Sequence, residues 1–167
     1  MKKYIGKLIS IEFSDRKSAL HGLLVDYSDE WILLKNNVVD YVIDGYTIIK
    51  RKNIAEIIRD EDIKFTEKVL KLKNISIVNS PTVPLTNLED ILNYLTNEFG
   101  IFQFETKSET ACYLGSLKSI DAKKLIINSL SPKGKRDGNE EFRPNDIRII
   151  AFDNDYINSL KLVAKIA

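Results

Sequence analysis

Two short basic runs are the parts of this chain whose residue types point most directly to chemistry. They are Lys50, Arg51 and Lys52 in the first half, and Lys133, Lys135 and Arg136 in the second. Lysine and arginine side chains on exposed turns contact phosphates or acidic partners. Charged residues are also common at the solvated tips of hairpins, so both interpretations remain open.

Four aromatic residues of the first half, Tyr27, Trp31, Tyr41 and Tyr46, are the second candidate group. They could form a platform on which bases stack, or a face that binds another protein. For Trp31 we favour packing in the core or between domains over ligand stacking.

Catalytic and metal-binding constellations are missing from the sequence. The single histidine, His21, and the single cysteine, Cys112, cannot build a histidine-rich metal site. There is no glycine-rich phosphate loop, nucleophile elbow or zinc spacing. Two acidic pairs, Asp60 with Asp62 and Asp153 with Asp155, are better explained as helix starts than as acid–base groups. We therefore predict no enzyme activity, no metal and no cofactor.

Composition and charge fit an ordinary globular protein. The 167 residues are 44% apolar and 29% charged, with a net charge of +1, so the molecule as a whole does not attract nucleic acid. The basic start resembles a signal peptide, but Gly6, Lys7, Ser10 and Glu12 interrupt its apolar run. One cysteine permits no intramolecular disulfide, which suits a reducing compartment. We expect a cytoplasmic protein with no membrane partner.

The two halves of the chain look like copies of one unit. With a shift of 93 positions and no gaps, ten of the 63 pairs from Leu8 to Leu70 are identical. Among them, Gly22 falls on Gly115 and Asp44-Gly45 falls on Asp137-Gly138. A duplication fixes the number of domains and their boundaries together.

Short alternating segments predict five strands in the first copy. They cover 7–13, 19–27, 31–34, 46–49 and 54–58, and equivalent strands are expected in the second copy. Gly22 marks a bend inside a strand. Asp44-Gly45 predicts a tight turn. Closely spaced strands of this kind favour small barrels.

Helices are predicted at three places: 60–73, 88–99 after a cap at Thr86 or Asn87, and 153–167. Pro81 and Pro84 forbid helix and mark a linker. The expected domains are 1–74, a barrel with a C-terminal helix, and 86–167, a barrel with N- and C-terminal helices. Residues 75–85 are the expected linker.

Both halves resemble Sm-like domains, the strongly bent five-stranded barrels of the Sm, LSm and Hfq superfamily. Residues 22–34 and 115–127 follow the spacing of the first Sm motif, and residues 48–54 and 141–147 are similar to the second. The resemblance predicts a mainly β fold with capping helices, made of two tandem five-stranded Sm-like (SH3-like) barrels.

The resemblance implies binding of single-stranded RNA and assembly into rings. Carried over by position, the pocket residues are Ser28, Glu30, Ile32 and Lys50 in the first barrel, and Asp121, Lys123, Leu125 and Arg143 in the second. The chain departs from the family here, because no position supplies an aromatic stacker and apolar residues replace both asparagines. Asp121 with Arg143 is the only pair retained.

These observations lead to a non-enzymatic binding or assembly module that associates with itself through strand edges. In one branch it binds single-stranded RNA through 50–52, 133–136 and Arg143. In another it binds proteins, as a scaffold without nucleic acid. A third hypothesis is a small-molecule sensor that uses the cleft between barrels and the Trp31/Tyr27 face.

Overall fold

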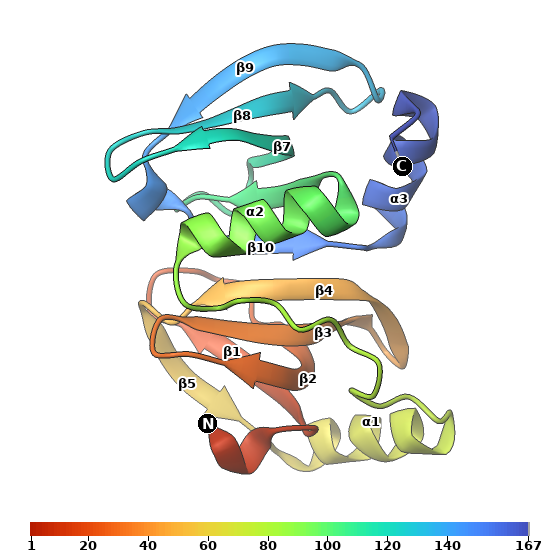
Figure 1. The fold of residues 1–167 in the computed structure, drawn as a ribbon. Helices are drawn as coiled ribbons and strands as arrows, with labels where there is room; N and C mark the ends of the chain where they lie inside the picture. Colours follow the sequence, from red (N-terminus) through yellow and green to blue (C-terminus); the bar gives the residue numbers. More distant parts are fainter. Residues whose placement is uncertain (167) are drawn as a thin grey trace. The chain divides into compact units, whose positions relative to one another are not determined.

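The computed structural model describes residues 1–166 and has a mainly β architecture, with ten antiparallel strands and three α-helices (Figure 1). The chain divides into two compact units, Met1–Thr82 and Val83–Ala167, which we call unit 1 and unit 2. No helix within residues 1–166 is long and apolar enough to cross a membrane.

Unit 1 is a five-stranded sheet followed by a helix. After a 3-10 turn at Lys2–Tyr4, its elements are β1 (Leu8–Phe13), β2 (Leu20–Tyr27), β3 (Trp31–Val39), β4 (Val42–Lys50), β5 (Ile54–Ile58) and α1 (Glu61–Leu72). The strand order is β5-β1-β2-β3-β4. Asp60 caps α1, because its carboxylate accepts a hydrogen bond from the Ile63 amide at 2.9 Å.

Unit 2 repeats this plan and adds a helix in front of it. Its elements are α2 (Leu88–Phe99), β6 (Phe102–Glu105), β7 (Cys112–Ile120), β8 (Leu125–Leu130), β9 (Arg136–Phe142), a 3-10 turn at Pro144–Asp146, β10 (Ile149–Phe152) and α3 (Asp155–Ala164). The strand order is β10-β6-β7-β8-β9. Asn87, one of the two expected caps, accepts from the Asp90 amide. Asn154, rather than Asp153, caps α3.

The duplication extends to the register of the strands. Nearly every residue pair in unit 2 is a pair of unit 1 with 93 added to both members. Examples are Ile9–Gly22 with Phe102–Gly115, Gly22–Asn36 with Gly115–Ser129, and Ile32–Ile49 with Leu125–Phe142. The bulge after Leu24 in β2 also recurs after Leu117 in β7. A one-residue slip would turn every side chain to the wrong face, so this agreement locates the same core in both units.

The sheets are open, whereas two barrels were expected. Within each unit the pairing follows one linear order, and the first and last strands of that order do not pair with each other. A five-stranded sheet is narrow for complete closure. Bulges curl each sheet around its core without joining its edges.

Two glycines at equivalent positions of the repeat, Gly22 and Gly115, allow neighbouring backbones to approach closely. A Cβ atom on Gly22 would lie 2.6 Å from the Lys35 carbonyl oxygen, and one on Gly115 would lie 2.4 Å from the Asn128 carbonyl oxygen. Real Cβ atoms do not approach other heavy atoms this closely. At Gly22 in β2 and at Gly115 in β7, the neighbouring strand therefore leaves no room for a side chain. The predicted bend at Gly22 therefore has a steric cause.

The tight turn predicted at Asp44-Gly45 is wrong. Both residues lie inside β4, and their equivalents Asp137 and Gly138 lie inside β9. The chain reverses earlier, at Asp40, and β3 and β4 change register opposite Gly45. Gly45 has φ +65°, which suits a bulge residue as well as a turn. The dipeptide alone cannot distinguish the two.

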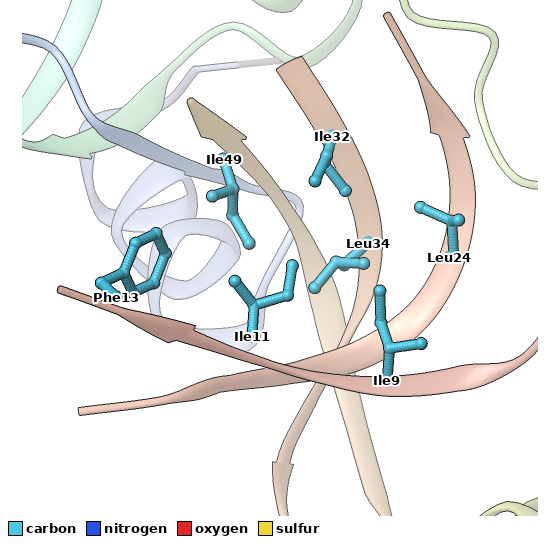
Figure 2. Packing of buried hydrophobic residues seen from close by; sticks show 7 residues of the cluster. All are labelled: Ile9, Ile11, Phe13, Leu24, Ile32, Leu34 and Ile49. Carbon is cyan, nitrogen blue, oxygen red and sulfur yellow. The ribbon is translucent and has the colours of Figure 1, made fainter. Parts of the chain in front are cut away.

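Unit 1 buries side chains on both faces of β1 and β2. Figure 2 shows the inner cluster, in which seven side chains from the first four strands point toward one another: Ile9, Ile11, Phe13, Leu24, Ile32, Leu34 and Ile49. On the other face, Leu8 and Leu23 pack with Leu70 of α1. Unit 2 likewise packs Ile157 and Leu160 of α3 with Ile101, Leu114 and Leu130.

The segment expected as a linker, 75–85, is packed along much of its length. Ile75 and Ile77 join the cluster around Leu70. The Lys35 ammonium donates to the Ser76 carbonyl at 2.9 Å. Val83 and Leu85 are buried. The division between the units falls inside this segment.

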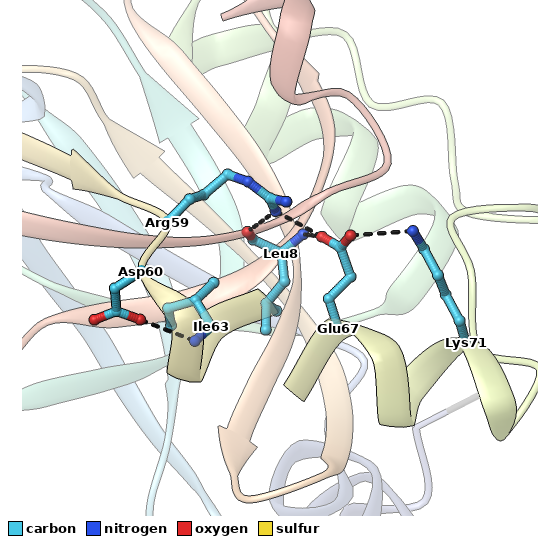
Figure 3. A network of polar contacts seen from close by, with 6 residues as sticks. All are labelled: Leu8, Arg59, Asp60, Ile63, Glu67 and Lys71. Carbon is cyan, nitrogen blue, oxygen red and sulfur yellow. Dashed lines mark hydrogen bonds and ion pairs between the residues drawn. The ribbon is translucent and has the colours of Figure 1, made fainter. Parts of the chain in front are cut away.

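A buried carboxylate ties α1 to the sheet (Figure 3). Glu67 is 7% exposed and accepts hydrogen bonds from the Leu8 amide at 2.7 Å, from Arg59 at 2.6 Å and from Lys71 at 3.0 Å. Burial opposes ionisation, but the three hydrogen bonds and the charge of Arg59 outweigh it and lower the pKa of Glu67 to about 2. The equivalent of Glu67 in unit 2 is Leu160, which lies in the apolar cluster instead.

Candidate nucleic-acid interface

Two connections of unit 2 meet around a hollow of about 280 Å³. One is the turn between β7 and β8, which contributes Ala122 and Lys123. The other is the connection from β9 to β10, which contributes residues 143–146. Lys123 and Arg143, twenty residues apart in the chain, therefore line the same depression. The sequence predicted both as nucleic-acid contacts, and the structure brings them together.

Asp121 holds the first connection in shape. Its carboxylate accepts hydrogen bonds from the amides of Lys123 and Lys124, both at 2.8 Å. These two backbone hydrogen bonds, aided by the nearby charge of Lys124, lower the pKa of Asp121 below its usual value. Asp121 therefore orients Lys123 and does not itself line the hollow.

Arg143 projects from the second connection. Its side chain is 81% exposed, and its Nε donates to the Asp146 carboxylate at 3.0 Å. Lys124 approaches Glu141 at 3.7 Å. Exposed ion pairs of this kind contribute little stability, so a phosphate could replace Asp146 as the partner of Arg143 at small cost. The predicted pairing of Arg143 with Asp121 is replaced by pairing with Asp146.

In unit 1 the position equivalent to Arg143 holds Lys50, and the neighbouring Arg51 has a structural role. Arg51 donates from Nη1 to the Ser28 carbonyl at 2.7 Å, and from its amide to the Glu30 carbonyl at 2.7 Å. Its guanidinium therefore joins the two turns and is used structurally. Lys50 lies beside Trp31, with its ammonium 5.9 Å from the ring centroid, and Lys52 is exposed. Within the first basic run, Arg51 therefore stabilises the fold through its hydrogen bond to the Ser28 carbonyl.

The second basic run lies at the other end of unit 2. Arg136 begins β9 and Arg143 follows its last residue, so about 20 Å separates them along an extended strand. Arg136 donates to the Asn128 carbonyl at 3.1 Å and braces β8. Lys133 and Lys135 are exposed on the hairpin turn. These residues do not join Lys123 and Arg143 in one surface.

The four aromatic residues of unit 1 do not form a single platform. Trp31 is 2% exposed. Tyr27 packs against the inner cluster, and the Tyr46 hydroxyl donates to Ser80 at 3.4 Å. Tyr41 instead contacts Phe65 of α1, with ring centroids 6.3 Å apart. Burial of Trp31 fits the packing interpretation favoured for it.

Sequence reasoning missed an aromatic group in unit 2. Phe104, Tyr113 and Phe142 pack together, with ring centroids 4.6 to 5.5 Å apart. They occupy positions equivalent to Ile11, Leu20 and Ile49, which belong to or border the inner cluster of unit 1. The repeat was the signal that could have assigned them to the core. Phe142 and Tyr113 are half-buried, and Phe142 directly precedes Arg143.

The remaining candidates for a catalytic or metal-binding site are Cys112 and His21, which lie in different units. Cys112 is exposed on β7, and Gln103 donates to its sulfur at 2.9 Å. His21 lies on β2 of unit 1. Within residues 1–166, no three His, Cys, Asp or Glu side chains gather closely enough to hold a metal ion.

Comparison with known proteins identifies no relative: no family model, curated protein or solved structure matches this chain.

Proposed function

We propose that the chain is a non-enzymatic binding module of two Sm-like units, and that unit 2 binds single-stranded RNA at the hollow lined by Lys123 and Arg143. The convergence of these two side chains from separate connections is the observation that carries the proposal. We place this activity in the cytoplasm, in keeping with the single cysteine.

The chemistry of the hollow suits a phosphate with its attached sugar. Arg143 offers a planar set of donors that matches phosphate oxygens, and Lys123 supplies a second positive charge. A volume of about 280 Å³ accommodates part of one nucleotide rather than a folded RNA. Because Asp146 already partners Arg143, we expect weak, salt-sensitive binding with little sequence preference.

Support for the Sm-like assignment comes from the repeated architecture. Both units have the same strand order, the same bulge in the second strand and a glycine that permits close backbone approach. Within its own unit, β5 pairs only with β1 and β9 pairs only with β8. These edges are the surfaces through which we propose self-association by strand addition.

Fluorescence anisotropy with a labelled single-stranded RNA at low salt tests RNA binding. Lys123→Ala and Arg143→Ala should each weaken binding on the order of tenfold, and each should reduce the salt slope by about 0.7. Lys107→Ala is the matched control, because Lys107 is an exposed lysine of unit 2 in the loop before β7, at the far end of that strand from the hollow. No binding by the wild type, or equal weakening by Lys107→Ala, would refute the proposal.

Binding of proteins is a second candidate, and one observation favours it. Exposed apolar side chains gather on unit 1, where the sequence alone suggested only a tyrosine cluster. A scaffold that uses this surface would bind its partner without nucleic acid, and its binding would depend little on salt.

A further inference from the structure

Unit 1 carries an apolar surface formed by the β3–β4 hairpin and α1. We call it the α1 surface; its exposed members are Val38, Val39, Tyr41, Val42, Phe65 and Leu72. Phe65 is 56% exposed and Leu72 is 76% exposed. Tyr41 joins the hairpin to the helix, because its ring contacts Phe65 and its carbonyl accepts from Lys73 at 2.8 Å. Apolar side chains gathered in this way mark interaction sites.

Unit 2 shows that the fold does not require these apolar residues. The positions equivalent to Val38, Tyr41, Val42, Phe65 and Leu72 hold Ser131, Gly134, Lys135, Asn158 and Lys165. The strand pairing is the same in both units, and a helix follows the last strand in each. At these five positions unit 1 therefore has apolar side chains that the shared fold does not demand.

The charges on α1 are arranged symmetrically about Phe65. Asp62 lies three residues before it and Lys68 three residues after it, which places both on its helical face. Both are exposed. If two such helices lie antiparallel with their Phe65 side chains in contact, each Asp62 lies at the same level along the helices as the Lys68 of the other helix, within reach of its long side chain. The surface is thus complementary to itself.

We propose that the α1 surface binds a second copy of this chain, forming a two-fold symmetric dimer. In this dimer the two α1 helices pack antiparallel, with Phe65 at the axis and two Asp62–Lys68 ion pairs beside it. The hairpin residues Val39 and Val42 extend the apolar contact on either side. A symmetric interface of this kind needs one self-complementary patch, and the α1 surface provides it. The proposal is independent of RNA binding and of strand edges.

Sedimentation equilibrium of the full chain provides the test. The wild type should show at least twice the 19.1 kDa chain mass, and only the part of the association that depends on Phe65 belongs to the α1 surface. Phe65→Asn and Leu72→Lys, which introduce the residues of unit 2, should weaken the dimer at least tenfold. Leu162→Asn is the control, because Leu162 is 81% exposed on α3. Circular dichroism should confirm that all variants remain folded.

Charge exchange tests the orientation of the helices. Asp62→Lys and Lys68→Asp should each weaken the dimer on the order of tenfold, since each places like charges together twice. The double variant Asp62→Lys/Lys68→Asp should restore it. A monomeric wild type, a dimer unaffected by Phe65→Asn, or failure of the double variant to recover would overturn the proposal. Phe65-dependent binding of a monomer to anionic vesicles would also overturn it and indicate a lipid surface.

Discussion

Replacement of Glu67 by glutamine should destabilise unit 1 by about 3 kcal/mol at neutral pH. The magnitude follows from the pKa of Glu67, which is lowered from 4.5 to about 2 in the folded protein. Each unit of pKa corresponds to about 1.4 kcal/mol. Glutamine keeps the shape of the side chain and can still accept from the Leu8 amide, but it loses the charge that Arg59 and Lys71 neutralise.

The pH dependence of this effect has a defined sign. Because folding depresses the pKa of Glu67, its contribution is fully present above pH 4.5 and is lost as the pH falls toward 2. The stability difference between the wild type and Glu67→Gln should therefore be constant near neutrality. It should shrink below pH 4.5 and approach zero near pH 2.

Urea unfolding followed by tryptophan fluorescence measures this difference. Trp31 is the only tryptophan and is buried in unit 1, so its signal reports the unfolding of that unit. Glu61→Gln is the control, because Glu61 pairs with Lys64 on the exposed side of the same helix, where an ion pair contributes about 0.5 kcal/mol. An equal loss for Glu67→Gln at pH 7 and pH 2 would contradict the assigned role of the carboxylate.

Further predictions concern two strand glycines, two helix caps and Lys71. Gly22→Ala and Gly115→Ala should each cost about 1–3 kcal/mol in thermal or urea unfolding, because the added methyl meets a carbonyl oxygen; a neutral effect would contradict the close approach. Asp60→Ala and Asn154→Ala should each cost about 1 kcal/mol by removing a helix cap, whereas retention of full stability would argue against these hydrogen bonds. Lys71→Met should cost under about 0.5 kcal/mol, because its ammonium is largely exposed and Arg59 still neutralises Glu67; a loss as large as that of Glu67→Gln would show that Lys71 carries the interaction.

The strands and helices could be predicted because their signals are local. Alternation located β1 and β2, and the cap residues located α1 and α2. Where a residue suits two local structures, sequence reasoning failed. Gly45 suits both a turn and a bulge, and only pairing with β3 decides between them.

The candidate site was predictable in part. Lys123 and Arg143 were named through their positions in a resembled motif, and their meeting around one hollow required the fold. Arg51 looked equivalent to other exposed arginines until its guanidinium was found on the Ser28 carbonyl. A long, charged side chain can reach many hydrogen-bond partners. Which partner it binds depends on the turn that the fold places beside it, and the adjacent basic residues in the sequence do not reveal this.

The sequence by itself determined that one unit occurs twice, since the shift of 93 positions that aligns Gly22 with Gly115 also aligns the strand pairs. Identity of hydrophobic pattern imposes identity of register, because side chains alternate between faces. Only the tertiary structure decided which side chains each copy buries and which it exposes at equivalent positions. At equivalent places, unit 1 buries the Glu67 carboxylate and exposes Phe65, whereas unit 2 buries Leu160 and carries Asn158. The burial of a residue depends on which helices and strands pack against it. The residues next to it in the sequence do not determine that packing.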